Sequence, residues 1–82
     1  MLIPGCWIRA NDVHGFGGSF RRFANLHECQ TACVNSASCV AIDWEPFSPY
    51  GETCWILTDT AVAPTLESGT ITHYELDRAC QS

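Results

Sequence analysis

The six cysteines of this chain constrain its fold more than any other feature, because they fall within only 82 residues. A domain of this size buries about 60–65% of the surface that its unfolded chain exposes, so its apolar core leaves little surplus stability. An even number of cysteines in so short a chain is typical of a disulfide framework formed in an oxidising compartment. We therefore expect an extracellular protein, either secreted or the ectodomain of a membrane protein.

The length of the chain admits one domain. Hydrophobic residues make up 46% and charged residues 16% of the sequence, which favours a folded chain over a disordered one. Residues 1–5 lack the basic and apolar regions of a signal peptide, and no apolar run is long enough for direct membrane insertion. We interpret residues 1–5 as a linker or a segment added for expression, residues 6–80 as the domain, and residues 81–82 as a tail.

The charge of the chain disfavours several classes of partner. The formal net charge is -5, and the four basic residues are all arginines scattered along the sequence. Nucleic-acid binding needs cations clustered on one face to neutralise phosphates, so we expect no nucleic-acid partner. Heparin-type polyanions and anionic membrane surfaces are disfavoured for the same reason, and the absence of lysine strengthens this expectation.

One segment has the pattern of an α-helix. Asn25 is a good N-cap residue, and Glu28 follows it at the spacing of a capping box. Leu26, Cys29 and Cys33 then share one helical face. The pattern predicts a helix over Leu26–Val34, which Asn35 ends.

The remaining pattern indicates short antiparallel strands. The expected strands are Cys6–Arg9, Phe20–Phe23, Cys39–Trp44, Thr53–Leu57 and Thr70–Leu76. Three segments are rich in turn residues and are expected to be irregular: the loop His14–Ser19, the long hairpin loop Glu45–Glu52 and the loose stretch Thr58–Gly69. One helix among several antiparallel strands places the chain in the α+β class, as a small disulfide-rich domain.

The use of the cysteines can be argued in part from spacing. Six cysteines allow 15 pairings, and the sequence by itself leaves them open. Structural zinc favours two close pairs such as C-x2-C, whereas the close spacings here are x3 and x5 and the other cysteines stand alone. We therefore expect disulfides, with no metal site and no cofactor.

No residue pattern indicates an enzyme. A fully paired set of cysteines leaves no thiol for nucleophilic catalysis. No catalytic motif surrounds His14, His27 or His73, so we interpret each as an ordinary surface or hydrogen-bonded histidine. The acidic residues show no motif that marks two of them as an acid and a base. We expect no catalytic residues.

Aromatic residues near the expected hairpin loop are the candidate ligand contacts. Phe47, Tyr50 and Trp55 crowd a segment with two prolines, and aromatic rings there could bury much area at low entropy cost. Trp55 alternates with Cys54 and is expected to point away from the face of that cysteine. Packing within the loop is an equal alternative for Phe47 and Tyr50. Arg21 and Arg22 could contact an acidic partner, although a solvated strand edge explains this pair more simply.

The order of the cysteines resembles a known family. The run Cys29-x3-Cys33-x5-Cys39, followed by Val-Ala-Ile-Asp-Trp, a loop and Cys54-Trp-Ile-Leu, is similar to the PAN/apple domain, as is the segment His73–Leu76 shortly before Cys80. The resemblance implies one α-helix packed on a curved antiparallel β-sheet. It also implies the bridges Cys29–Cys54 and Cys33–Cys39, with a third bridge, Cys6–Cys80, joining the ends as in the apple subgroup.

The same resemblance implies a function. Members of this family are extracellular adhesion or recognition modules that bind proteins or carbohydrates. We expect a module that mediates protein–protein recognition within a larger secreted or cell-surface protein. A carbohydrate-binding, lectin-like module and a stand-alone secreted effector, such as a small inhibitor, are the alternatives.

Overall fold

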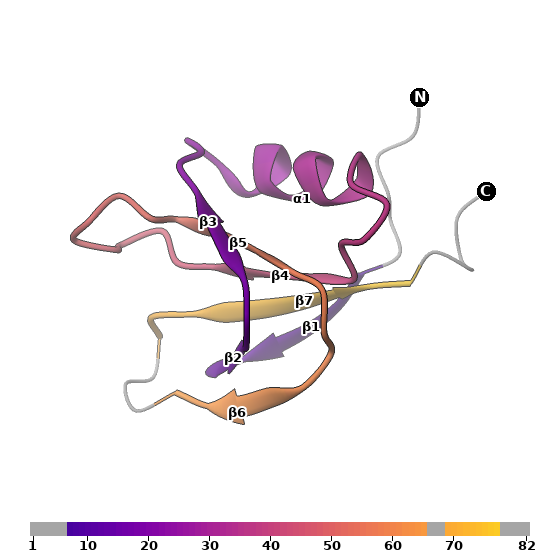
Figure 1. Ribbon diagram of the computed structural model, residues 1–82. Helices are drawn as coiled ribbons and strands as arrows, with labels where there is room; N and C mark the ends of the chain where they lie inside the picture. The colour runs from indigo at the N-terminus through magenta and orange to yellow at the C-terminus, as the bar shows by residue number, and fades with distance from the viewer. Residues whose placement is uncertain (1–6, 66–68, 78–82) are drawn as a thin grey trace.

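The computed structural model describes residues 7–65 and 69–77 as three stacked layers (Figure 1). The helix α1 (Leu26–Val34) lies above a five-stranded sheet, and a two-stranded ribbon lies below the sheet. The predicted class, a small disulfide-rich α+β domain with one helix on an antiparallel sheet, is confirmed. The ribbon was not predicted, and it forms one side of the cleft described below.

The five-stranded sheet has antiparallel pairing throughout. Its strands, in spatial order, are β1 (Trp7–Asn11), β7 (Thr72–Leu76), β4 (Ala41–Trp44), β5 (Cys54–Leu57) and β3 (Ser19–Arg21). The strands nearest the two ends of the chain are therefore neighbours, with Trp7 opposite Leu76. All five overlap the predicted strands, with ends that differ by up to two residues.

Helix α1 has the predicted boundaries, and its N-terminus has the predicted capping. The Asn25 Oδ1 atom accepts a hydrogen bond of 2.9 Å from the Glu28 backbone N–H. The Glu28 carboxylate in turn accepts one of 3.0 Å from the Ala24 N–H, one residue before the position expected for a capping box. At the other end the Asn35 N–H donates to the Thr31 carbonyl over 3.0 Å. Local capping chemistry thus sets both ends of the helix.

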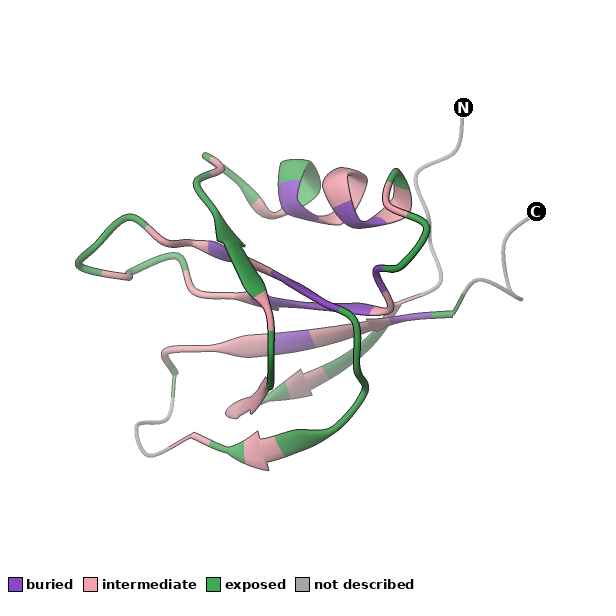
Figure 2. Cartoon of the chain, viewed as in Figure 1, coloured by how far each residue is buried: buried purple, intermediate pink, exposed green. Residues whose placement is uncertain are grey.

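The apolar core lies between α1 and the upper face of the sheet. Cys29 and Cys33 are the buried residues of the helix (Figure 2). Cys29 is bonded to Cys54 on β5, and Cys33 is bonded to Cys39 just before β4. These four cysteines have the expected pairing, whereas Cys6 and Cys80 lie outside the described residues. The core continues from the bridges into the sheet through Ile42, Ile56 and Leu76.

The two-stranded ribbon corrects two predictions of irregular structure. It consists of β2 (Val13–Gly15), in part of the segment expected to be the first loop, and β6 (Val62–Pro64), within the stretch expected to be loose. The chain reaches β2 through a turn at Asp12, whose φ of 64° is a left-handed conformation that aspartate tolerates. Pro64 can occupy β6 because the ribbon has only two strands, so its missing N–H costs no interior ladder bond. Propensity alone predicts neither strand.

Candidate ligand-binding cleft

Glycines allow the ribbon and the loop after it to approach the lower face of the sheet. A Cβ atom added to Gly15 would collide with the Leu57 side chain. One added to Gly18 would lie 2.6 Å from Leu57 Cδ2 and 3.1 Å from the Ile56 carbonyl oxygen. No larger residue fits at either position without movement of β5 or its side chains. The segment from Gly15 to Gly18 thus packs closely against the lower face of the sheet, and we call it the glycine wall.

A buried polar pair joins the ribbon to the sheet. Asp43 on β4 and His73 on β7 are only 4% and 3% exposed, and they are opposite one another in the ladder. His73 Nδ1–H donates to Asp43 Oδ1 over 2.8 Å, and the other carboxylate oxygen accepts the Gly15 N–H, also over 2.8 Å. Both oxygens of a buried carboxylate are therefore satisfied, as such burial requires. The interpretation of His73 as a hydrogen-bonded histidine is confirmed.

Two adjoining cavities open beside this pair. The inner cavity, of about 290 Å³, is lined by His14, Gly15, Gly17, Gly18, Asp43, Glu45, Trp55, Leu57 and Ile71. The outer cavity, of about 440 Å³, is lined by His14, Glu45, Phe47, Pro49, Pro64, Thr65, Thr70 and Ile71. Because His14, Glu45 and Ile71 line both, we treat the two cavities as one cleft. The cleft runs from the glycine wall to the β4–β5 hairpin loop.

The electrostatic character of the cleft comes chiefly from Glu45, which directly follows β4. Burial raises the pKa of Glu45 above its ordinary value of 4.5, and the negative charges of Glu52 and Asp43 raise it further. A hydrogen bond from the Trp55 side chain acts in the opposite direction on this pKa. No arginine lines either cavity in the described part of the chain, and the sequence contains no lysine. The cleft is therefore acidic and has no cation of its own.

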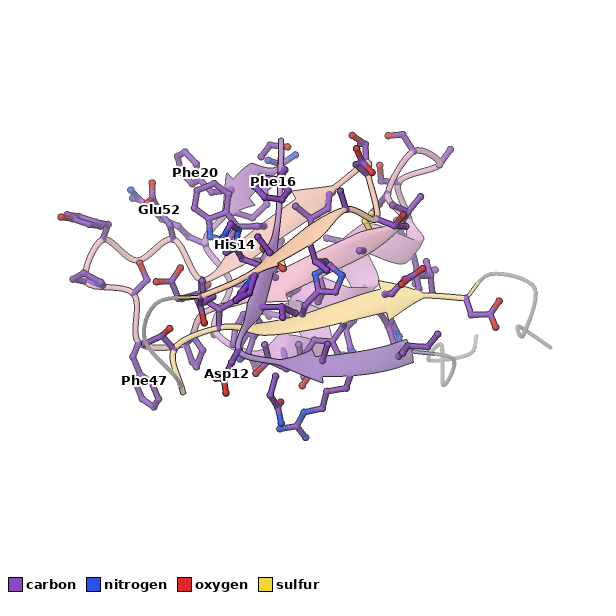
Figure 3. The ribbon with its side chains drawn as sticks, turned by 90° about the horizontal axis from the view of Figure 1, so that it is seen from below. Asp12, His14, Phe16, Phe20, Phe47 and Glu52 are labelled. Atoms are coloured by element: carbon purple, nitrogen blue, oxygen red, sulfur yellow. A yellow bond between two sulfur atoms is a disulfide. The ribbon has the colours of Figure 1, made fainter. Side chains whose placement is uncertain are left out.

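Aromatic rings border the cleft on the β2 and β3 side. The His14 and Phe16 rings meet edge to face with centroids 5.1 Å apart. The Phe20 and Trp55 rings do the same at 5.8 Å. The view from below shows His14 and Phe16 close together, with Phe47 further along the molecule (Figure 3). The contact with Phe20 supports Trp55 in its place in the inner cavity.

The predicted ligand contacts fall into two groups in the structure. Phe47 and Trp55 both line the cleft, Phe47 in the outer cavity and Trp55 in the inner one. Trp55 is half-buried on the lower face of the sheet, away from the face of Cys54, as the alternation predicted. Tyr50 is 75% exposed on the hairpin loop and lines neither cavity.

The predicted arginine pair lies outside the cleft. Arg21 and Arg22 are exposed, and Arg21 Nη1 donates to the Phe20 carbonyl over 3.0 Å. The Arg22 side chain lies beside Gly51, 3.9 Å from where a Cβ of that glycine would be. The structure thus brings Arg22 to the hairpin loop but not to the acidic lining.

Sequence reasoning missed the residues that give the cleft its chemistry, above all His14 and Glu45. A partial signal existed: Asp43 and Glu45 are two residues apart and share a strand face by alternation. Three glycines within four positions, Gly15, Gly17 and Gly18, also indicated a close backbone approach. Neither signal reveals that the two segments meet.

Comparisons with known proteins identify no relative: no family model, no curated protein and no solved structure matches the chain. Two further findings concern the described residues alone. None of their helices is long and apolar enough to cross a bilayer. No group of three or more of their His, Cys, Asp and Glu side chains could hold a metal ion.

Proposed function

We propose that this chain is an extracellular recognition module of the PAN/apple type, and that it binds another protein through the cleft and the hairpin loop beside it. The extracellular setting is supported by disulfides, which persist in oxidising compartments. The proposed family is supported by the order of the cysteines in the sequence. A binding role without catalysis is supported by Asp43, whose two oxygens are already engaged within the fold.

The observation that carries the proposal is an exposed aromatic loop at the mouth of a cleft. Phe47 is 83% exposed and Tyr50 is 75% exposed, although both could bury large apolar areas. Phe47 also lines the outer cavity, so a partner that covered the loop would reach the cleft as well. Exposed aromatic side chains beside a concavity are typical of protein-binding surfaces, where a few such residues supply most of the affinity.

Carbohydrate binding is the second candidate, and the lining of the outer cavity favours it. A sugar would find an aromatic face on Phe47 and polar groups on Glu45, Thr65 and Thr70. We rank it second because Tyr50 extends the exposed aromatic surface beyond the cleft. A flat contact with a protein uses that surface, whereas a sugar held in the outer cavity does not.

The test is a parallel screen of the oxidised domain on arrays of extracellular proteins and of glycans. We expect a protein ligand whose affinity falls at least about tenfold in the variant Phe47→Ser, the loss of one interface anchor. The variant Ile8→Ser is the matched control, because Ile8 is also exposed (60%) but lies on the edge strand β1. Equal losses in both variants, or binding to glycans alone, would contradict the protein-binding proposal.

A further inference from the structure

We propose that the inner cavity receives an arginine side chain of the bound protein, with Glu45 as its counter-ion. This inference rests on the proposed function and specifies its chemistry. It is carried by the size of the inner cavity, the charges that face it and the groups that line it.

The inner cavity has the size of a pocket for one side chain. Its volume of about 290 Å³ lies at the lower limit of the about 300–1,000 Å³ typical of small-molecule sites. The outer cavity, which adjoins it at Glu45 and His14, leaves room for neighbouring residues of the same partner segment. Glu45 therefore lies where the side chain of a bound segment would pass from the outer cavity to the inner one.

The charges at the inner cavity favour a cation. Glu45 is partly desolvated and faces the negative charges of Asp43 and Glu52. Each Asp43 oxygen already accepts one hydrogen bond within the fold, from His73 or from the Gly15 N–H, so Asp43 acts on the cavity chiefly through its charge. Glu45 accepts from Trp55 and keeps further acceptor positions on its two oxygens. A cationic donor would relieve the repulsion and bond to Glu45 at the same time.

The other lining groups favour a guanidinium over an ammonium. The Trp55 ring lines the inner cavity, and a planar guanidinium stacks on an aromatic ring more effectively than a compact, strongly hydrated ammonium. His14 Nδ1–H donates to the Gly15 carbonyl over 2.8 Å, so Nε2 of the neutral ring can only accept. The five N–H groups of arginine point in fixed directions from one planar group, so a single guanidinium can donate to both His14 and Glu45.

The first experiment titrates the isotope-labelled domain with the peptide acetyl-Gly-Arg-Gly-amide and follows backbone and indole N–H signals by NMR. We expect saturable shifts at the Trp55 indole and at the amides of Gly15, Gly17 and Gly18. The matched probe replaces arginine by citrulline, which has the same shape without the charge. We expect citrulline to bind at least about tenfold more weakly, the scale of a charge-assisted hydrogen bond. The lysine peptide should fall between the two.

Variants and pH test the role of Glu45. Glu45→Gln should weaken binding of the arginine peptide about tenfold. Glu75→Gln removes the same charge from β7, at a residue that lines neither cavity, and should leave the affinity for the peptide unchanged. Because a bound cation favours ionised Glu45, affinity should increase as pH rises through the raised pKa of Glu45. The other titratable groups near Glu45 are His14 on β2, Asp43 on β4 with His73 bonded to it, and Glu52 in the hairpin loop.

The outcomes separate this inference from the proposed function. Equal affinities for the arginine and citrulline peptides, or an arginine peptide insensitive to Glu45→Gln, would overturn the inference. A protein partner that depends on Phe47 and not on Glu45 would also overturn it while supporting the proposed function. If the domain bound neither an arrayed protein nor the arginine peptide, both proposals would fail.

Discussion

The two faces of the five-stranded sheet are held to their neighbouring layers by different means. On the upper face, α1 packs on an apolar core, and the Cys29–Cys54 bridge ties the helix to β5. On the lower face, the β2–β6 ribbon is held by close packing of Gly15 against Leu57 and by a hydrogen bond from the Gly15 N–H to the buried Asp43. The burial pattern shows the contrast: purple positions gather on the helix and the central strands, while the ribbon is pink and green (Figure 2).

The difference indicates a division of roles between the faces. An apolar core with covalent bridges stabilises the fold through close packing. A layer joined by a directional bond and a close contact at Gly15 can leave a cleft further along, at Glu45. We therefore expect the upper face to dominate stability and the lower face to dominate binding.

Removal of the long bridge should have the largest effect. The Cys29–Cys54 bridge spans 25 positions and the Cys33–Cys39 bridge spans 6. In the chain-entropy model, loops of these lengths correspond to about 3.5 and about 2.2 kcal/mol of stabilisation. Replacing both cysteines of the long bridge by alanine should thus lower the free energy of unfolding by more than the same change at the short bridge. Urea denaturation of the two double variants measures the difference.

The two double variants are matched, because each replaces two buried half-cystines by two alanines. Their difference therefore reports loop closure more than lost packing. An equal or larger loss at the short bridge would show that α1 is held by its local connection to β4 and not by its attachment to β5.

The largest effect on the lower face is expected from Asp43→Asn. An asparagine offers one acceptor oxygen where Asp43 serves both His73 and Gly15, so one buried hydrogen bond is lost. Hydrogen bonds to charged groups contribute about 1.5–3 kcal/mol, and we expect a loss of stability in this range. Asp59→Asn is the control, since Asp59 is exposed and accepts one bond from Ala61. Amide exchange at Gly15 should accelerate in the first variant alone; exchange that stays slow would show that the ribbon is held by packing.

The same division explains which parts of the fold could be predicted from sequence. The upper face follows local rules: Asn25 and Glu28 cap a helix, and the spacing of Cys29 and Cys33 places both on one side of it. The ribbon depends on contacts between distant segments, with Val13 opposite Pro64, and each strand is only three residues long. No local pattern of propensity or periodicity encodes such a pairing.

The sequence could indicate residues of the candidate site only where the type and local context of a single residue suggest a ligand contact. Phe47 and Trp55, which line the cleft, could be proposed as ligand contacts because exposed or outward-facing aromatic residues are recognisable from their loop and strand context. Glu45 and His14 were missed because their significance arises when β2 is brought to the end of β4. Asp43 alternates with core residues and would face solvent if the ribbon were absent, so its burial is a property of the tertiary structure.

The glycine wall provides a smaller test. Gly15→Ala would place a Cβ against the buried Leu57 side chain, and overpacking of this kind costs about 1–3 kcal/mol. Combining it with Leu57→Val, which removes the colliding atoms, should recover part of the loss. Gly17→Ala is the comparison, because Gly17 has open space around it and a φ of 71°, so its cost is conformational. Thermal unfolding of the single and double variants should show recovery for Gly15→Ala and none for Gly17→Ala.

The smallest expected effect is a gain in stability from Glu45→Gln. Because the pKa of Glu45 is raised in the folded protein, folding favours its protonated form. The wild-type protein therefore has its full contribution from this group below the ordinary value of 4.5 and loses it as pH rises through the raised pKa. Glutamine does not titrate and can still accept from Trp55. The variant should thus match the wild type in acid and exceed it at neutral pH, by up to about 0.5 kcal/mol, as is usual for a partly exposed position. Denaturation at several pH values measures this difference.

Burial is the largest cause of the raised pKa of Glu45, and the charges of Glu52 and Asp43 are smaller causes. Added salt should therefore remove only a minor part of the gain in stability. A gain abolished by salt would mean that repulsion dominates, whereas a loss of stability at neutral pH would mean that ionised Glu45 stabilises the lower face.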